Sequence, residues 1–298
     1  METLADHGAL ILKSLEPSAG DSHSDCIPMP RLTKVVMQVD ADGRSLLAGH
    51  TVFTGNDREL IEALVQLKAA SRPQFVITPN VNQTLALEAE PRLRTAYETA
   101  SLRLLDGMPL VLLARILGSR SAQRHTGADL LPKVVGRSVE LNWKIAIAGG
   151  SNEASSRAAS NLRSRYPGAD VVPVSVPQLA DVSDPQSTIV IEVLHQLRPD
   201  IVFLCLGSPK QEQWFVQWQS WLPAAVYVGA GAAVDFAAGH ATRAPRWMQK
   251  ACLEWLWRLG QEPSRLAGRY LIHGPGFAKI AARSILKKGA QGIRKFGP

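Results

Sequence analysis

The sequence predicts an α/β protein with a mainly parallel, Rossmann-like sheet that has helices on both faces, followed by a helical, basic C-terminal appendage. Three observations support this fold class. Short apolar runs typical of buried strands alternate with amphipathic runs typical of helices over most of the chain. The apolar runs end at polar or glycine-rich turns, as at 149–152 and 207–212. Positions 263–298 hold eight basic residues and no acidic ones.

Composition is that of a folded protein of a reducing compartment. The 298 residues are 46% hydrophobic and 20% charged. Three widely spaced cysteines suggest neither a disulfide framework nor a zinc site, so a cytoplasmic location is expected. Residues 1–30 lack the basic-then-apolar order of a signal peptide and are expected to form a flexible N-terminal segment. We expect an α/β catalytic domain at 31–245 and a helical, membrane-associating appendage at 246–298.

The positive charge is concentrated in the appendage. The formal net charge is +7, and the eight basic residues after position 262 leave the first 262 residues with a charge of −1. A neutral body with a cationic arm suits an anionic membrane surface or a phosphate-bearing substrate better than nucleic acid. Residues 213–234 contain no charge, but polar residues and a proline interrupt them, so no membrane span is expected.

In the first half of the chain, strands are predicted at 35–39, 74–77 and 102–105, and helices at 57–67, 82–90 and 110–117. Asn56 is a suitable N-cap for the first helix. The Asp-Ala-Asp-Gly sequence at 40–43 could be read as a metal-binding DxD motif, but it fits a hairpin turn better.

In the second half, strands are predicted at 143–148, 171–174, 201–206 and 225–228. Helices are predicted after the turn at 149–152 as far as Arg165, at 187–197, and after the turn at 207–212. Pro245 fits a helix start, and apolar residues from Trp247 onward recur at helical spacing up to a stop at Gly260. Residues 274–276, Gly-Pro-Gly, predict a helix break. Residues 277–288 are expected to form an amphipathic helix whose apolar face would enter a membrane interface; a disordered, solubilising tail is the alternative.

Candidate catalytic residues follow the predicted strands, because the carboxyl ends of parallel strands share the ligand-binding edge of a sheet. Asp106 follows the third strand and precedes Gly107, which fits a catalytic base or an ordinary Asp-Gly turn. Thr78 and Asn80 follow the second strand in the same way. Arg124 could bind phosphate or pair with Asp129.

Candidate binding residues lie in two glycine-containing turns. Gly149 and Gly150 precede a helix and could present backbone N–H groups to a phosphate, although a double glycine is as often a tight turn. The turn at 207–212 is more specific, since it offers amide, ammonium and carboxylate groups at one helix start. Its candidate residues are Gly207, Pro209, Gln211 and Glu212.

No cofactor is expected, and histidine and acidic residues show no metal-ligand spacing. A metal-free enzyme must stabilise a leaving diphosphate with arginines, helix N-termini or backbone donors. The candidates are Arg243, Arg258, Arg265 and Arg269.

Taken together, these turns resemble the WecG/TagA/CpsF glycosyltransferase family over about residues 35–270. The resemblance rests on ordered motifs rather than on one signature. These are Thr78-Pro79-Asn80, Asp106-Gly107, the 124–130 sequence Arg-His-Thr-Gly-Ala-Asp-Leu, Gly149-Gly150, Tyr166-Pro167, the 207–212 turn, Gly229-Ala230-Gly231 with Asp235, Arg243-Ala244-Pro245, and Glu254-Trp255 through Arg258 to Glu262-Pro263.

The resemblance implies an inverting, metal-independent enzyme that transfers a hexose, of N-acetylmannosamine, mannosaminuronic acid or glucose type, from a UDP-sugar to a polyprenyl-diphosphate-linked sugar. It implies that Asp106 is the base, that Thr78 and Asn80 line the pocket and that Gln211 lies in the nucleotide site. Gly231 and Asp235 belong to the same motifs, and the appendage arginines would close over the diphosphate. The expected setting is the inner face of a bacterial cytoplasmic membrane, in surface polysaccharide synthesis.

Some features depart from the family pattern. Gln123 stands where a glutamate is usual, the aromatic turn around 174–178 is absent, and Arg265 and Arg269 are four residues apart rather than three. The first two departures leave the identity of the sugar open, and the third leaves open which arginine of the family each of the two matches. The linkage and any homo-oligomer are also open. A catalytically silent, nucleotide-binding scaffold at the membrane surface is the alternative, and a nucleotide-binding regulator is a third reading.

Overall fold

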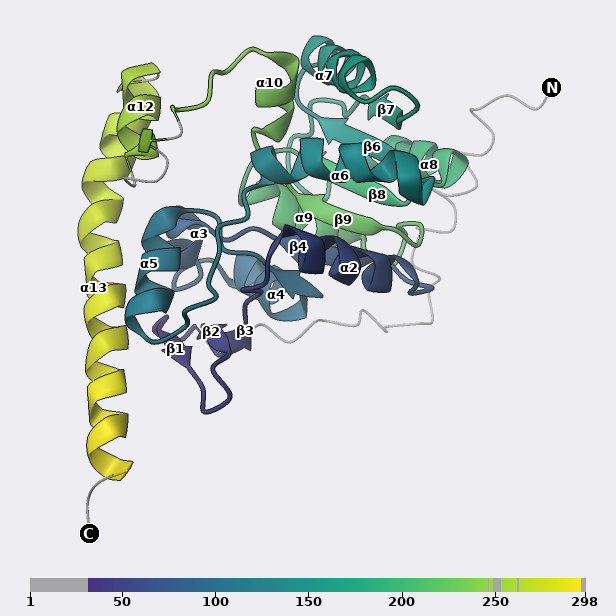
Figure 1. Ribbon diagram of the computed structural model, residues 1–298. Coiled ribbons are helices and arrows are strands. Elements are labelled where there is room, and N and C mark those ends of the chain that lie inside the picture. Colours follow the sequence, from purple (N-terminus) through teal and green to yellow (C-terminus); the bar gives the residue numbers. More distant parts are fainter. Residues whose placement is uncertain (1–31, 246, 249–252, 262, 296–298) are drawn as a thin grey trace, which may run out of the picture.

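The computed structural model describes residues 32–245, 247–248, 253–261 and 263–295 (Figure 1). The side chains of residues 255, 258, 263–273 and 291–295 lie outside this description. The segment 1–30, predicted to be flexible, also lies outside it.

A six-stranded parallel sheet forms the centre of the molecule, which confirms the predicted fold class. Its strand order is β5-β4-β9-β8-β6-β7, and all five neighbouring pairs are parallel. The strands are β4 (Gln74–Ile77), β5 (Leu102–Arg103), β6 (Lys144–Gly149), β7 (Asp170–Val174), β8 (Ile201–Cys205) and β9 (Val226–Gly229). Each lies within one or two residues of its predicted position.

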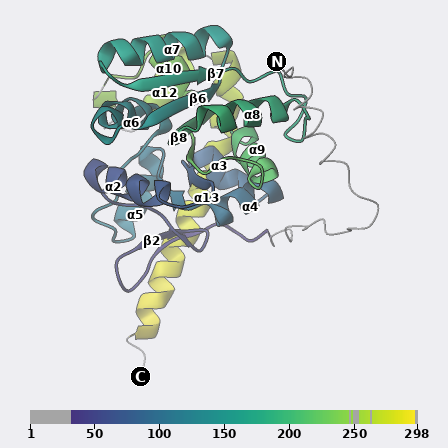
Figure 2. The same ribbon diagram turned by 90° about the vertical axis from the view of Figure 1, so that its right-hand side faces the viewer.

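Helices cover both faces of this sheet (Figures 1 and 2). One face is packed by α2 (Asp57–Lys68), α6 (Gly127–Leu141), α7 (Asn152–Arg165) and α10 (Ala233–Ala238). The other is packed by α4 (Pro91–Thr99), α5 (Met108–Ile116), α8 (Ser187–Leu197) and α9 (Lys210–Trp218), with the short α3 (Val81–Ala86) beside them. Alternate strand residues supply the two cores, since successive side chains of a strand point to opposite faces.

Local sequence explains how several helices begin. Asn56 and Asn80 each cap a helix in a capping box, with Glu59 and Gln83 as the reciprocal partners. The helices α4, α6 and α10 were not predicted. In α6 the reason is local, because Pro132 and Gly136 lie inside the helix and weaken the helical pattern.

A small antiparallel sheet stands apart from the main one. It consists of β1 (Met37–Val39), β2 (Ser45–Leu47) and β3 (His50–Thr51). The Asp40 carboxylate accepts hydrogen bonds from the backbone N–H groups of Asp42 and Arg44, so the DxD sequence is a hairpin turn, as predicted.

The appendage differs from its prediction in two ways. Residues 247–248 are helical, but Leu253 is not, and the next helix, α12 (Glu254–Gln261), continues through Gly260, so the proposed stop at Gly260 is wrong. The helix α13 (Pro263–Lys295) is continuous for 33 residues and includes Pro275, so the break predicted at 274–276 is also wrong. Packing against the body explains why the break does not occur. A side chain at Gly276 would lie 2.8 Å from Leu85, so the glycine lets α13 approach the end of α3 closely.

The apolar face of α13 is part of the protein core. Ile280 is fully buried, and Phe277 and Ala281 pack against the same cluster. The Ser284 hydroxyl accepts a hydrogen bond of 2.9 Å from the Met37 N–H, and the Arg283 guanidinium pairs with Glu88. The prediction that this face enters a membrane is therefore wrong, because periodicity shows that a face is apolar but not what covers it. Among the described residues, no helix is long and apolar enough to cross a membrane.

The end of α13 is more exposed. Ile285 and Leu286 have exposed fractions of 46% and 72%, and the last turns of the helix project beyond the body (Figures 1 and 2).

Candidate active site

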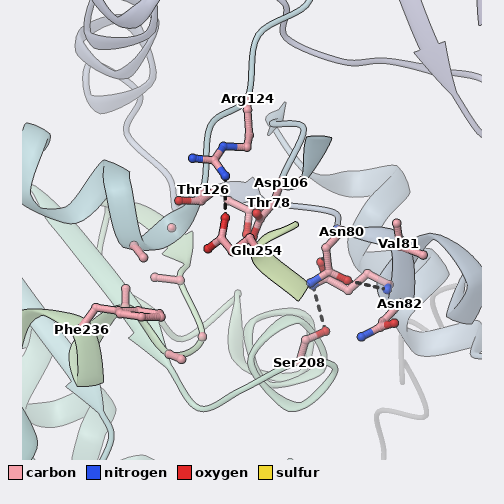
Figure 3. A pocket seen from close by; sticks show the side chains of 18 of the residues that line it. Thr78, Asn80, Val81, Asn82, Asp106, Arg124, Thr126, Ser208, Phe236 and Glu254 are labelled. Atoms are coloured by element: carbon pink, nitrogen blue, oxygen red, sulfur yellow. Dashed lines mark hydrogen bonds and ion pairs between the residues drawn. The ribbon is translucent and has the colours of Figure 1, made fainter. Parts of the chain in front are cut away.

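A cavity of about 390 Å³ lies at the carboxyl edge of the parallel sheet. Figure 3 shows its walls, which come from the loops after β4, β5, β8 and β9, from the start of α6, and from α12. Eight of the predicted site residues line it: Thr78, Asn80, Asp106, Arg124, Gly207, Gln211, Gly231 and Arg243. The sheet thus brings together residues that lie up to 165 positions apart in the sequence.

Asp106 follows β5 at this edge. Its backbone N–H donates to the Pro79 carbonyl oxygen at 3.0 Å, which ties together the loops after two neighbouring strands. Gly107 adopts a φ of 120°, a conformation that favours glycine, and this lets the chain turn directly into α5. Burial raises the pKa of the Asp106 carboxyl to about 7; the negative charge of Glu254 adds to this, while Arg124 and Arg243 oppose it.

Thr78 and Asn80 have partly structural roles. The Thr78 hydroxyl donates to the Gly229 carbonyl oxygen at 2.8 Å and links β4 to the end of β9. Asn80 uses its side-chain oxygen to cap α3, accepting from the Gln83 N–H at 3.0 Å. A ligand in the cavity would therefore meet the Nδ2 donors of Asn80.

Behind the cavity wall lies a buried amide network. Glu212 is fully buried, and its Oε1 atom accepts hydrogen bonds from the side-chain amides of Gln83 and Gln211, each at 2.8 Å. Gln211 in turn accepts from the Gly231 N–H at 2.9 Å. Burial raises the pKa of Glu212 to about 7. Glu212 therefore orients Gln211 from behind rather than facing a ligand itself, which differs from the direct contact predicted for it.

An ionic cluster of Arg124, Asp129, Arg243 and Glu254 forms another wall. Glu254 bridges the two arginines, with one carboxylate oxygen 2.7 Å from Arg124 and the other 2.7 Å from Arg243. Asp129 also binds both guanidinium groups. Figure 3 shows the ion pair between Arg124 and Glu254 as a dashed line, with Asp106 beside it. Arg124 thus does pair with Asp129, and it lines the cavity as well.

Some of the predicted residues whose side chains are described do not line the cavity. Gly149 and Gly150 pack closely instead, because side chains there would lie 2.8 Å from the Cys205 carbonyl oxygen and from Val234. Pro209 and Asp235 lie next to lining residues but do not line the cavity. Arg258, Arg265 and Arg269 belong to α12 and α13, and their side chains lie outside the description.

Several lining or supporting residues had no predicted role: Gln83, Thr126, Phe236 and Glu254. Two of them have a local signal, since Asn80–Gln83 and Thr126–Asp129 both show the three-residue spacing of a helix cap. Glu254 has no such signal, because its partner Arg124 lies 130 residues away. In the part of the chain that is described, no group of three or more His, Cys, Asp or Glu side chains could hold a metal ion.

The fold and the site together define a class of protein: a Rossmann-like α/β protein with a half-buried carboxyl and two arginines in a cavity at the carboxyl edge of the sheet. Residues 46–291 match the model of the glycosyl transferase WecG/TagA/CpsF family. The chain therefore belongs to this family.

Two curated relatives are similar over part of the chain, and both are named N-acetylglucosaminyldiphosphoundecaprenol N-acetyl-beta-D-mannosaminyltransferase. The first, from Bacillus subtilis (strain 168), is 30% identical over 160 residues, which is 54% of this chain and 60% of the relative. The second, from Bacillus spizizenii (strain ATCC 23059 / NRRL B-14472 / W23), is 25% identical over 191 residues, or 64% of this chain and 72% of the relative. The alignment thus spans less than two thirds of the first relative.

Proposed function

We propose that this protein is an inverting, metal-independent glycosyltransferase that moves a hexose from a UDP-sugar to a polyprenyl-diphosphate-linked sugar. The observation that carries the proposal is the half-buried Asp106 carboxyl, with its raised pKa, in the same cavity as Arg124 and Arg243. A base and an anion-binding group are the two components that a single displacement with a nucleoside diphosphate leaving group requires.

In this proposal Asp106 removes the proton from the acceptor hydroxyl. The hydroxyl oxygen forms a bond to the anomeric carbon from the face opposite the diphosphate, and the bond from that carbon to UDP breaks with its electron pair. The proton stays on Asp106. A carboxyl whose pKa lies near 7 is a stronger base than an ordinary aspartate, yet it is still ionised in a large share of molecules at neutral pH.

The charge that develops on UDP has candidate partners in the same cavity. Arg124 and Arg243 have side-chain exposures of 15% and 24%, so their charges are screened less than those of surface arginines. Gln211, in the turn at 207–212, and Gly231 line the part of the cavity where we propose that the nucleotide binds. Arg258, Arg265 and Arg269 remain proposed partners of the diphosphate.

The names of the two relatives favour N-acetylmannosamine among the three hexose types. They also favour an acceptor made of N-acetylglucosamine linked to undecaprenyl diphosphate. On this basis we propose that this chain acts in surface polysaccharide synthesis.

Because such an acceptor is anchored in a bilayer, we also propose that the protein docks on the inner face of the cytoplasmic membrane. The end of α13 supports this, since Ile285 and Leu286 are exposed beside Lys287 and Lys288. Across from them on α5, Leu112 and Ile116 have exposed fractions of 42% and 62%, and the Lys288 ammonium donates to the Ile116 carbonyl oxygen.

The direct test is a donor screen with the purified protein and lipid-linked N-acetylglucosamine, read out as UDP release. We expect release from UDP-N-acetylmannosamine that depends on the acceptor. Absence of UDP release from every UDP-hexose, together with retained UDP binding, would favour the silent scaffold instead.

A further inference from the structure

The ionic cluster on the cavity wall has no net charge. Arg124 and Arg243 contribute two positive charges, and Asp129 and Glu254 contribute two negative ones. All four side chains are at least two-thirds buried, so these charges interact through a medium that screens them less than bulk water. As it stands, the cluster offers a diphosphate no net attraction, although its two guanidinium groups have the right chemistry for one.

The two carboxylates of the cluster are held differently. Asp129 lies in the first turn of α6 and is fixed locally: its Oδ2 accepts from the Thr126 hydroxyl at 2.8 Å, and its N–H donates to the Thr126 side chain at 3.1 Å. Glu254 is the first residue of α12, a separate helix that reaches the cavity from the appendage. Asp129 therefore belongs to the framework of the body, whereas Glu254 is brought to the arginines from outside it.

Glu254 also binds the arginines as a phosphate would. Its two oxygens each contact one terminal nitrogen of a different guanidinium group, both at 2.7 Å. Two oxygens of one anionic group bridging two arginines is also an arrangement that a phosphate can make.

We propose that Glu254 is a displaceable counter-ion that holds Arg124 and Arg243 in position when no donor is bound and exchanges with the diphosphate of the donor. The inference rests on the proposed function, because it takes the diphosphate to be that of the UDP-sugar. It makes Glu254 a positioning residue: it keeps two arginines apart and aligned without substrate and gives up both ion pairs when the donor binds.

The test is calorimetric titration of the full-length protein with UDP and with uridine at fixed pH and salt. Glu254→Gln keeps the shape of the side chain but removes the competing charge, so we expect UDP to bind about tenfold more tightly, which is the effect of one modest ion pair. Uridine, which lacks the diphosphate, should bind equally to both proteins. Glu140→Gln, which breaks an exposed pair with Arg137 on α6, is the matched control and should leave UDP affinity unchanged.

A second variant separates an effect on UDP binding from an effect on folding. Glu254→Asp keeps the charge but is too short to span both arginines, and it should tighten UDP binding by a smaller factor. Thermal unfolding is followed for both variants.

Weaker or unchanged UDP binding by a folded Glu254→Gln protein would overturn the inference, because Glu254 would then only anchor the arginines. Loss of the folded state in both variants would overturn it in the same way. If the unsubstituted protein itself bound no UDP, the proposed function would fail instead, so the two failures are distinguishable.

Discussion

Asp106 is the residue on which the proposed chemistry depends most. Replacing it by asparagine keeps the shape of the side chain and removes the base, so we expect transfer to fall by about 10²- to 10⁴-fold while UDP-sugar binding persists. The measurement is kcat for UDP release together with the donor affinity by calorimetry. Retention of more than about a hundredth of the rate would rule out Asp106 as the base.

The same residue should set the pH dependence. Because its pKa is raised to about 7 and the base must be ionised, kcat/KM should rise with pH up to about 7 and level off above it. The charges of Glu254 and Asp129 raise this pKa, and those of Arg124 and Arg243 lower it. The substitution Glu254→Gln should therefore shift the rise of kcat/KM to lower pH. The residual activity of Asp106→Asn should not rise with pH in this range. A rise that persists in that variant would show that another group is responsible for it.

Residues at strand ends could be found from the sequence because the parallel fold forces them to one edge. Thr78, Asn80, Asp106 and Gln211 converge for that reason. Glu254 could not be found in this way, and Glu212 was found but was assigned a direct ligand contact that it does not make. The contact of Glu254 joins segments far apart in the chain, and the role of Glu212 depends on its being fully buried behind Gln211.

At the scale of the element, the helix α13 shows the same limit. Its apolar spacing predicted an amphipathic helix, and the helix is present. The partner of the buried face is decided by the β1 strand and the core beside α5, which no local pattern reveals. Truncation at Gly274 would remove Ile280 and Ser284 from the core, so point substitutions are the better probe of membrane binding.

For that reason we expect Leu286→Ser to weaken sedimentation with anionic vesicles without changing the melting temperature. Leu286 is 72% exposed, so its substitution removes an exposed apolar contact rather than a core contact. Ile189→Ser on α8, where the side chain is 56% exposed, is the matched control and should leave sedimentation unchanged. Equal losses in both variants, or none in either, would mean that the end of α13 is not the docking surface.

Ile280→Ala on the same helix should behave in the opposite way. The side chain is fully buried, and its truncation should lower the free energy of unfolding by about 2–5 kcal/mol. Denaturant titration measures this loss. The pair of substitutions thus separates the packed face of α13 from its exposed end.

At the scale of the whole molecule, the distribution of charge leads to a prediction about metal ions. The proposed leaving group is stabilised by arginines and by backbone and amide donors, so EDTA should leave the transfer rate within about twofold of its original value. The assay is UDP release with and without chelator. A rate that disappears with EDTA and returns with magnesium or manganese would contradict the proposed mechanism.

The hydrogen bond between Met37 and Ser284 has a consequence for the order in which the chain folds during its synthesis. The two residues are 247 positions apart. At ribosomal rates of about 5–20 residues per second, Ser284 of α13 is synthesised on the order of 12 to 50 s after Met37 of β1. During that interval the side chains that later surround Ile280 are exposed to solvent. Chaperones or neighbouring nascent chains can bind the chain at this site. Premature termination anywhere before α13 would make that exposure permanent.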